Sequence, residues 1–488
     1  MKSTLTLLCV LCALVASSVA QEVPPAPGAP KSASVPAVKE KKLANGLTVA
    51  VVQKSQVPLV TINLLIRAGA SAEETSKAGL ADMTASMLTK GTKTRTATQI
   101  AEAIEFLGGS ISSGAGWNTS FISVTVTSDK VAPAMAILAD VVLNPQFDQK
   151  EIDLLKSQTL DGLTYNLKQP SFLANYVASK YSFKEHPAGG TPASIGMISR
   201  ADILKFQKDN YNPANSVLVF AGDISAATSA ALATKYFSVW GKGAKPAVKE
   251  MRLDRLTKIG SADTSGPRPI VNRFLVIDLP QSGQASVTYA RPIRGIGRSD
   301  RGYFPASVMN SVLGGGYSSR LNQEIRIKRG LSYGAGSSVA WRSGKANFST
   351  RTQTKNESAA EVTELVIDEL RKLSATLTAE SELVPRKSVL TGTFGLSLET
   401  TGGLASAIGE LYGFGMPSSE LNTYVANVNG VTDAQIKNFA LDNLLGGDIV
   451  IVGDYSIFKK DLAKRFPKMT VDVIKADDLD LSKDNLRK

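Results

Sequence analysis

Cysteine and histidine are nearly absent from this sequence of 488 residues. Both cysteines, Cys9 and Cys12, lie in an N-terminal segment that we expect to be removed. The mature chain would then have no disulfide, no thiolate metal ligand and no cysteine nucleophile. The single histidine, His186, lies in a Glu-His-Pro sequence, and we interpret it as a structural loop residue. A zinc site made of Cys and His is therefore hard to build, and no G-x-S-x-G motif marks a serine nucleophile.

Aromatic residues are also scarce, at 6%, and no long apolar run occurs beyond residue 20. A transmembrane helix needs about 18 consecutive apolar residues, so we expect no stable membrane insertion. The formal net charge is +12, but Lys and Arg are scattered among acidic residues. This pattern indicates a solvated basic surface and not a nucleic-acid-binding one. The length predicts two or more domains with sizeable cores.

The N-terminal segment 1–20 has the features of a secretory signal peptide. Lys2 supplies a positive charge, Leu5 to Val15 is apolar, and small residues precede a cleavage point near Ala20. The alternative is a membrane anchor, for which the apolar run is short. We therefore predict export to the periplasm. Residues 21–37 are rich in Pro, Ala and Ser and predict a flexible leader.

The rest of the chain divides into two halves of similar pattern. We predict a first domain at 38–245, a linker at 246–268, a second domain at 269–470 and a charged, extended tail at 471–488. In the first half the strand-like segment Phe121 to Thr127 precedes a helical pattern that begins at Val131. In the second half the polar strand Asn347 to Thr354 precedes a helix, for which Ser358 and Glu361 predict a capping box.

Each half also ends on an apolar strand followed by Gly-Asp, at Gly222-Asp223 and Gly453-Asp454. A duplicated domain explains this similarity economically. Strands and helices mix without strict βαβ alternation, which argues against a doubly wound parallel sheet. We therefore expect an α+β fold of two homologous domains, each a mostly antiparallel sheet packed with helices.

An ordered series of short motifs identifies a family resemblance. The first half contains Gly79-Leu80-Ala81, Lys90-Gly91-Thr92 and Tyr211-Asn212-Pro213, and the second contains Leu313 to Leu321 and Glu324 to Tyr333. In this order, over about residues 40–465, the chain resembles the pitrilysin/insulinase (inverzincin) peptidases, in the branch of bacterial processing peptidases. Each motif alone has little specificity, and it is their order that makes the resemblance specific.

Active members of this family carry H-x-x-E-H on a helix, where two His bind zinc and Glu is the general base. The corresponding residues here are Asp82, Ala85 and Ser86, and the downstream Glu ligand corresponds to Gly162, with Asp161 beside it. The resemblance thus implies that no catalytic residue is intact and that this chain binds no metal. The alternative is a self-sufficient enzyme, for which this alignment at the metal site would be wrong.

The family's substrate-binding residues are retained. Active enzymes use an Arg and a Tyr, seven residues apart, to bind the substrate backbone opposite the zinc, and Arg326 and Tyr333 fit this pattern. Both could instead merely anchor a strand. The run Gly314, Gly315 and Gly316 resembles a segment beside the substrate chamber, although a tight helix end or turn would also need glycines. No Gly-Lys-Ser/Thr follows, so a phosphate loop is disfavoured.

The resemblance implies a zinc-free subunit of a periplasmic heterodimeric metallopeptidase. A homologous partner with an intact H-x-x-E-H would hold the zinc, and this chain would bind the peptide substrate and complete the partner's active site. The alternative is a structural homologue, similar to the core proteins of respiratory complexes, with no role in proteolysis. The sequence does not separate a heterodimer from a homodimer.

Overall fold

The computed structural model describes residues 35–241 and 271–488. The predicted signal peptide and linker and most of the predicted leader lie outside these residues. Val35, at the end of the predicted leader, already belongs to the folded part, because it is buried and its N–H donates to Asn422 Oδ1 at 3.0 Å. None of the helices in the described parts combines the length and the apolar character that a membrane crossing requires.

The first half forms a six-stranded sheet with the order β1-β2-β6-β3-β5-β4. All neighbouring strands are antiparallel except β2 and β6. Its strands are β1 (Lys39–Lys42), β2 (Thr48–Gln53), β3 (Leu59–Ile66), β4 (Ser110–Ala115), β5 (Ser120–Thr127) and β6 (Ser216–Gly222).

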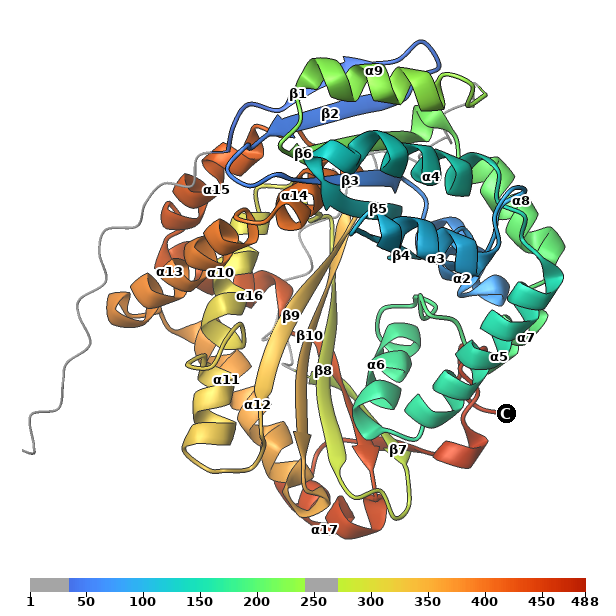
Figure 1. The fold of residues 1–488 in the computed structure, drawn as a ribbon. Coiled ribbons are helices and arrows are strands. Elements are labelled where there is room, and N and C mark those ends of the chain that lie inside the picture. The colour runs from blue at the N-terminus through green and yellow to red at the C-terminus, as the bar shows by residue number, and fades with distance from the viewer. Residues whose placement is uncertain (1–34, 242–270) are drawn as a thin grey trace, which may run out of the picture. The chain divides into compact units, whose positions relative to one another are not determined.

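The second half forms a sheet with the order β12-β7-β11-β8-β10-β9, in which β7 runs parallel to both β11 and β12. Figure 1 shows β8, β10 and β9 side by side, with β9 at the edge of the sheet. The strands are β7 (Val271–Asp278), β8 (Ala285–Arg294), β9 (Ala335–Arg342), β10 (Lys345–Thr354), β11 (Gly447–Gly453) and β12 (Val471–Lys475).

The two sheets have the same connectivity over five strands. The order β2-β6-β3-β5-β4 in the first half corresponds to β7-β11-β8-β10-β9 in the second. The strands before the two Gly-Asp pairs, β6 and β11, take equivalent central places and are buried along their whole length. A strand covered on both faces has a continuous apolar sequence, which explains the similarity that we detected. The predicted α+β fold of two homologous domains is confirmed.

Helices cover both sheets. The first half contains α2 (Leu80–Met87), α3 (Ala97–Phe106), α4 (Val131–Leu143), α5 (Gln149–Asn166), α6 (Pro170–Tyr181), α7 (Pro192–Met197), α8 (Arg200–Asn210) and α9 (Ala226–Phe237). The second contains α10 (Tyr303–Leu313), α11 (Arg320–Asn322), α12 (Ala359–Ala375), α13 (Glu380–Ser397), α14 (Thr401–Gly413), α15 (Glu420–Asn429), α16 (Asp433–Asn443) and α17 (Tyr455–Arg465). A π-helical segment, η6 (Gln323–Ile327), directly follows α11.

Apolar periodicity correctly located β5 and α4. Alternate residues of β5, including Ile122 and Val124, are buried, whereas their neighbours are half-exposed. On α4 the residues from Val131 to Val142 that face the sheet are buried. One face of each sheet therefore packs against its own half's helices, α4 and α9 in the first half and α12 and α17 in the second.

Two local predictions differ from the structure. Ser358 makes no side-chain hydrogen bond to the start of α12, because a 3-10 turn at Asn356–Ser358 leads directly into the helix and gives Ser358 helical dihedral angles. A capping side chain needs an extended residue at that position. The charged C-terminal segment is also not an extended tail, because β12 pairs with β7, and Ile474 and Leu486 are buried.

Each half gives one helix to the other half's sheet. Helix α6 packs on β8 and β11, and α14 packs on β3 and β6, which are the equivalent strands. On α6, Leu173 and Val177 are buried in one cluster with residues of β7, β8 and β11. Each such side chain contributes about 1.5–3 kcal/mol through the hydrophobic effect. On α14, Thr401 Oγ1 lies 2.9 Å from Thr61 Oγ1 of β3.

Candidate functional site

Helix α2, which the sequence resemblance aligns with the family's zinc-binding helix, is held at its N-terminus by a buried carboxylate. Glu73 Oε1 accepts a hydrogen bond from Gly79 N at 2.8 Å, and Oε2 accepts one from Ala81 N at 2.7 Å. These amides are unpaired within the helix, so Glu73 takes the place of an N-cap side chain. Burial nevertheless raises the pKa of Glu73 to about 7.

Asp82, which the sequence resemblance aligns with the first zinc-binding His, has a structural partner. Its Oδ1 accepts a hydrogen bond from the N–H of Ala115, the last residue of the edge strand β4, at 3.1 Å. Burial raises the pKa of this carboxyl above its ordinary value. Asp82 therefore ties α2 to the edge of the first sheet.

The other corresponding positions do not fit a zinc site. Ala85 is fully buried and carries no polar atom, and Ser86 is half-buried one turn after Asp82. Gly162 is exposed on α5, and a methyl group added there would meet no atom within 4 Å. Zinc sites in proteins use three or four Cys, His or carboxylate ligands. Across residues 35–241 and 271–488, no three His, Cys, Asp or Glu side chains are placed to hold a metal ion.

His186 lies beside this helix and is buried. Its Nδ1 is 3.5 Å from Glu73 Oε1, and its ring centroid is 5.1 Å from that of Trp117. Burial lowers the pKa of His186, so the imidazole is neutral at pH 7 and the pair with Glu73 is not a strong ion pair. The ring fills the space between the capping carboxylate and an aromatic side chain, as a structural residue does.

The neighbouring Glu185 joins the two halves. Its buried carboxylate lies 2.7 Å from Lys345 Nζ and 3.3 Å from Arg342 Nη2, and it accepts a hydrogen bond from Asn347 Nδ2 at 2.8 Å. The Arg342 guanidinium also stacks over Trp117, 4.8 Å from the ring centroid. One loop of the first half is thus bound to β9 and β10 of the second.

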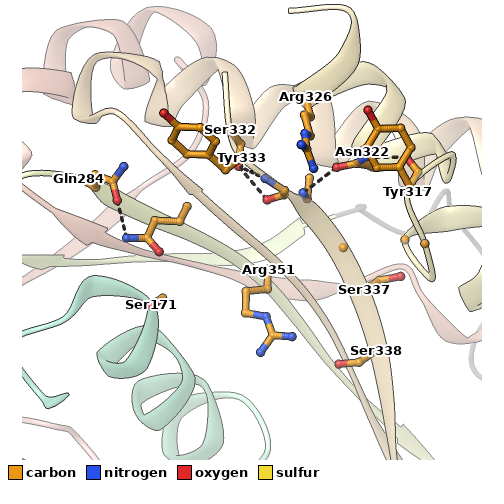
Figure 2. A pocket seen from close by; sticks show the side chains of 16 residues that line it. Ser171, Gln284, Tyr317, Asn322, Arg326, Ser332, Tyr333, Ser337, Ser338 and Arg351 are labelled. Carbon is orange, nitrogen blue, oxygen red and sulfur yellow. Dashed lines mark hydrogen bonds between the residues drawn. The ribbon is translucent and has the colours of Figure 1, made fainter. Parts of the chain in front are cut away.

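The predicted substrate-binding residues meet in one pocket. The pocket has a volume of about 660 Å³, and Arg326, Tyr333, Gly314 and Gly316 all line it (Figure 2). It lies along the edge strand β9, with Ser171 of α6 on the opposite side. Residues from both halves therefore form its wall.

Arg326 and Tyr333 are presented by a π-helical segment and the loop that follows it. Arg326 belongs to η6, and its guanidinium stands over the Tyr317 ring, 5.0 Å from the centroid. The helical segment ends at Ile327, and the turn after it reaches Gly330, which adopts a φ of 64°. Tyr333 is 91% exposed. The phenol is therefore available to a ligand and does not anchor the strand by burial.

Close packing explains two of the three glycines in the run, Gly314 and Gly315, whereas Gly316 has space around it. A methyl group at Gly314 would lie 2.2 Å from Ser337 N, and one at Gly315 would lie 2.7 Å from Ser311 Cα. At Gly316 the nearest atom, Arg386 Nη1, is 3.6 Å away. Gly314 also accepts a hydrogen bond from Ser337 N at 3.1 Å. The run thus lets the segment after α10 pass against β9, and Gly315 packs against α10 instead of lining the pocket.

Arg351, Ser171 and Glu73 were not predicted from the sequence. Arg351 lies on β10 and points to the pocket from the face opposite the core (Figure 2). The polar alternation of β10 contained a signal for it, since Asn347 to Thr354 was recognised as a polar strand. Ser171 lines the pocket only because α6 crosses to the other half, and no local pattern reveals such a crossing.

Comparisons with known proteins agree with this arrangement. Residues 48–182 match the insulinase family (peptidase family M16), and residues 197–383 match the peptidase M16 inactive domain. An uncharacterized zinc protease of Rickettsia bellii is 30% identical over 300 residues, which cover 61% of this chain and 68% of the relative. One of Rickettsia felis is 27% identical over 394 residues, which cover 79% and 91%.

Solved structures show the same fold. The peptidase M16 inactive domain from Pseudomonas fluorescens superposes with a TM-score of 0.75 at 26% identity, covering 85% of this chain and 98% of that one. A protease from Helicobacter pylori superposes with a TM-score of 0.77 at 17% identity, covering 86% and 100%. With its two matching segments, its duplicated sheets and the intact α2, the chain belongs to the insulinase family of peptidases, family M16.

Proposed function

We propose that this chain is the zinc-free subunit of a heterodimeric M16 peptidase and that it binds the peptide substrate. The observation that carries the proposal is a contrast between two places in the molecule. Arg326 and Tyr333 line one open pocket, whereas Ala85 and Gly162 offer no base and no ligand where an active member has them. A homologous partner with H-x-x-E-H would supply the zinc and the general base, and this chain would complete its active site.

Side chains, more than a strand ladder, would hold the peptide in this pocket. Edge strands often bind an extended peptide through their free backbone groups. Here the N–H of Ala335 already donates to Asn322 Oδ1 at 3.3 Å, and that of Ser337 donates to Gly314 O. The Tyr333 hydroxyl and the Arg326 guanidinium are side-chain donors of this pocket, and both suit a peptide carbonyl.

Reconstitution with a zinc-bearing homologue from the same organism tests the proposal. Hydrolysis of a quenched fluorescent peptide should require both chains, and Arg326→Ala should lower kcat/KM about 100-fold, as loss of a transition-state donor does. Arg371→Ala is the matched control, because Arg371 is exposed on α12 and, within the described part of the chain, forms an ion pair only with Asp368. If the partner is equally active without this chain, the proposal is wrong, and stable assembly with a non-peptidase complex would instead favour a structural role.

Metal analysis separates this proposal from a self-sufficient enzyme. After purification from zinc-supplemented medium, this chain should contain far less than one equivalent of zinc, and the partner should contain about one. A near-stoichiometric zinc content of this chain alone would overturn the division of roles.

We also propose that the mature subunit acts in the periplasm. The support is the signal-like segment that ends near Ala20. Mass spectrometry of the protein from osmotic-shock fluid should find a chain that begins at Gln21. An uncut chain in the cytoplasmic fraction would contradict the proposal.

A further inference from the structure

The pocket along β9 is basic and has no negative charge of its own. Its two ionisable side chains besides tyrosines are Arg326 and Arg351, and the other side chains that line it are uncharged. Two guanidinium groups in one recess create a positive potential, because the field of each adds to that of the other. Such a recess favours an anionic group on whatever binds there.

Neither arginine is neutralised by the surrounding protein. Among the described residues, Arg326 and Arg351 take part in no ion pair. Neighbouring arginines differ, since Arg320 Nη2 lies 2.7 Å from Glu382 Oε2 and Arg329 Nη1 lies 2.6 Å from Glu324 Oε2. Arg320 and Arg329 are thus paired, and the two arginines that line the pocket are available to a ligand.

The fold brings both arginines to the wall of one pocket. Arg351 of β10 is directly opposite Gly336 of β9 in the antiparallel ladder, so no side chain on β9 covers it. Arg326 descends from η6 on the other side of β9, beside Tyr317 (Figure 2). Arg326 and Arg351 thus line the same pocket from two separate elements.

We infer that this pocket selects peptides that carry a carboxylate, with Arg351 as a specificity-determining residue. The inference rests on the proposed peptide-binding function and adds the substrate class to it. Carboxylates match the guanidinium fork through paired, charge-assisted hydrogen bonds. Arg351 is exposed and screened by solvent, so the expected preference for a carboxylate is modest, about 10-fold in Kd at low salt.

The test uses the mature chain and short fluorescein-labelled peptides of Ala, Ser and Leu that differ at one central residue, Glu or Gln. By fluorescence anisotropy, the Glu peptide should bind about 10-fold more tightly, and the difference should shrink as salt rises. Arg351→Gln should remove most of this preference, because it should weaken binding of the Glu peptide far more than binding of the Gln peptide. Arg351→Lys should retain part of the preference for the Glu peptide, and the control Arg371→Gln should retain all of this preference.

Free and amidated C-termini identify the source of the carboxylate. If amidation weakens binding and the central Glu does not matter, the pocket reads the C-terminal carboxylate, which still supports the inference. If all four peptides bind equally, the inference is wrong while the peptide-binding function stands. If no peptide binds at all, the proposed function itself fails.

Discussion

Replacing Gly314 by alanine tests why the glycine run before η6 exists. The added methyl carbon would lie 2.2 Å from Ser337 N and 2.5 Å from Ser337 Oγ. Both distances are far below van der Waals contact, and one of the two atoms belongs to the backbone of β9. The strand must therefore move away, and the hydrogen bond from Ser337 N to Gly314 O, now 3.1 Å long, must lengthen or break.

The magnitude follows from these two effects. Inserting a methyl group into a packed contact costs about 1–3 kcal/mol, and losing the hydrogen bond adds about 1 kcal/mol. We therefore expect Gly314→Ala to lower the free energy of unfolding by about 2–4 kcal/mol. At Gly316 the nearest atom is the end of the Arg386 side chain at 3.6 Å. Gly316→Ala should be neutral or stabilise by about 0.5 kcal/mol, because alanine restricts the unfolded chain.

Urea-induced unfolding, followed by tryptophan fluorescence, measures both variants under the same conditions. The shift of β9 should also weaken peptide binding by Gly314→Ala more than by Gly316→Ala. If Gly314→Ala is as stable as Gly316→Ala, the close passage of β9 is not the reason for this glycine, and the geometric reasoning is refuted.

Three further predictions concern buried contacts elsewhere in the fold. Burial raises the pKa of Glu73 from about 4.5 to about 7. Between these two pH values the folded chain keeps a proton that the unfolded chain has released, so the stability falls as the pH rises from about 4.5 to about 7. Glu73→Gln removes this effect, so between pH 5 and 7.5 the wild type should lose up to about 3 kcal/mol of unfolding free energy relative to the variant in urea titrations. The lowered pKa of His186 has the opposite effect on stability, but His186 is present in both proteins. Parallel pH profiles of the two proteins would contradict the prediction. Glu185→Ala leaves the charges of Arg342 and Lys345 without their carboxylate and should lower stability by about 2–4 kcal/mol. The control Glu399→Ala removes an exposed partner of Lys54 and should change stability by less than about 0.5 kcal/mol. Equal shifts in melting temperature would mean that the buried Glu185 contacts do not stabilise the fold. Leu173→Ala on α6 should lower the free energy of unfolding in urea by about 2–5 kcal/mol. The control Leu396→Ala, at a position 75% exposed, should lower it by almost nothing. Similar values for both variants would mean that α6 contributes little to the packing of the two halves.

The sequence predicted those features that depend on local periodicity. The alternation along β5 and the helical spacing from Val131 located both elements. The capping box at Ser358 failed because a cap depends on the dihedral angles of one residue, and the preceding 3-10 turn made these helical. A short motif does not contain that information.

The candidate site was predictable only in part, because its residues come from separate parts of the chain. Motif order identified Arg326 and Tyr333, and both line the pocket. Arg351 and Ser171 face them from another strand and from the other half of the chain. Which residues face one another across a pocket depends on how α6 crosses to the second sheet, and this crossing is a property of the whole fold.

The exchange of α6 and α14 has a consequence for how the chain holds together. Each half offers a helix and accepts the equivalent one, at equivalent strands. This is the arrangement of an isologous dimer, in which one patch meets its own copy across a two-fold axis. The chain is thus comparable to a symmetric homodimer whose subunits have been fused. In such a dimer the covalent connection mainly raises the effective concentration of one half near the other. Two fragments separated within 246–268 should therefore still find each other and associate, because the surfaces that unite them are contributed by the halves themselves.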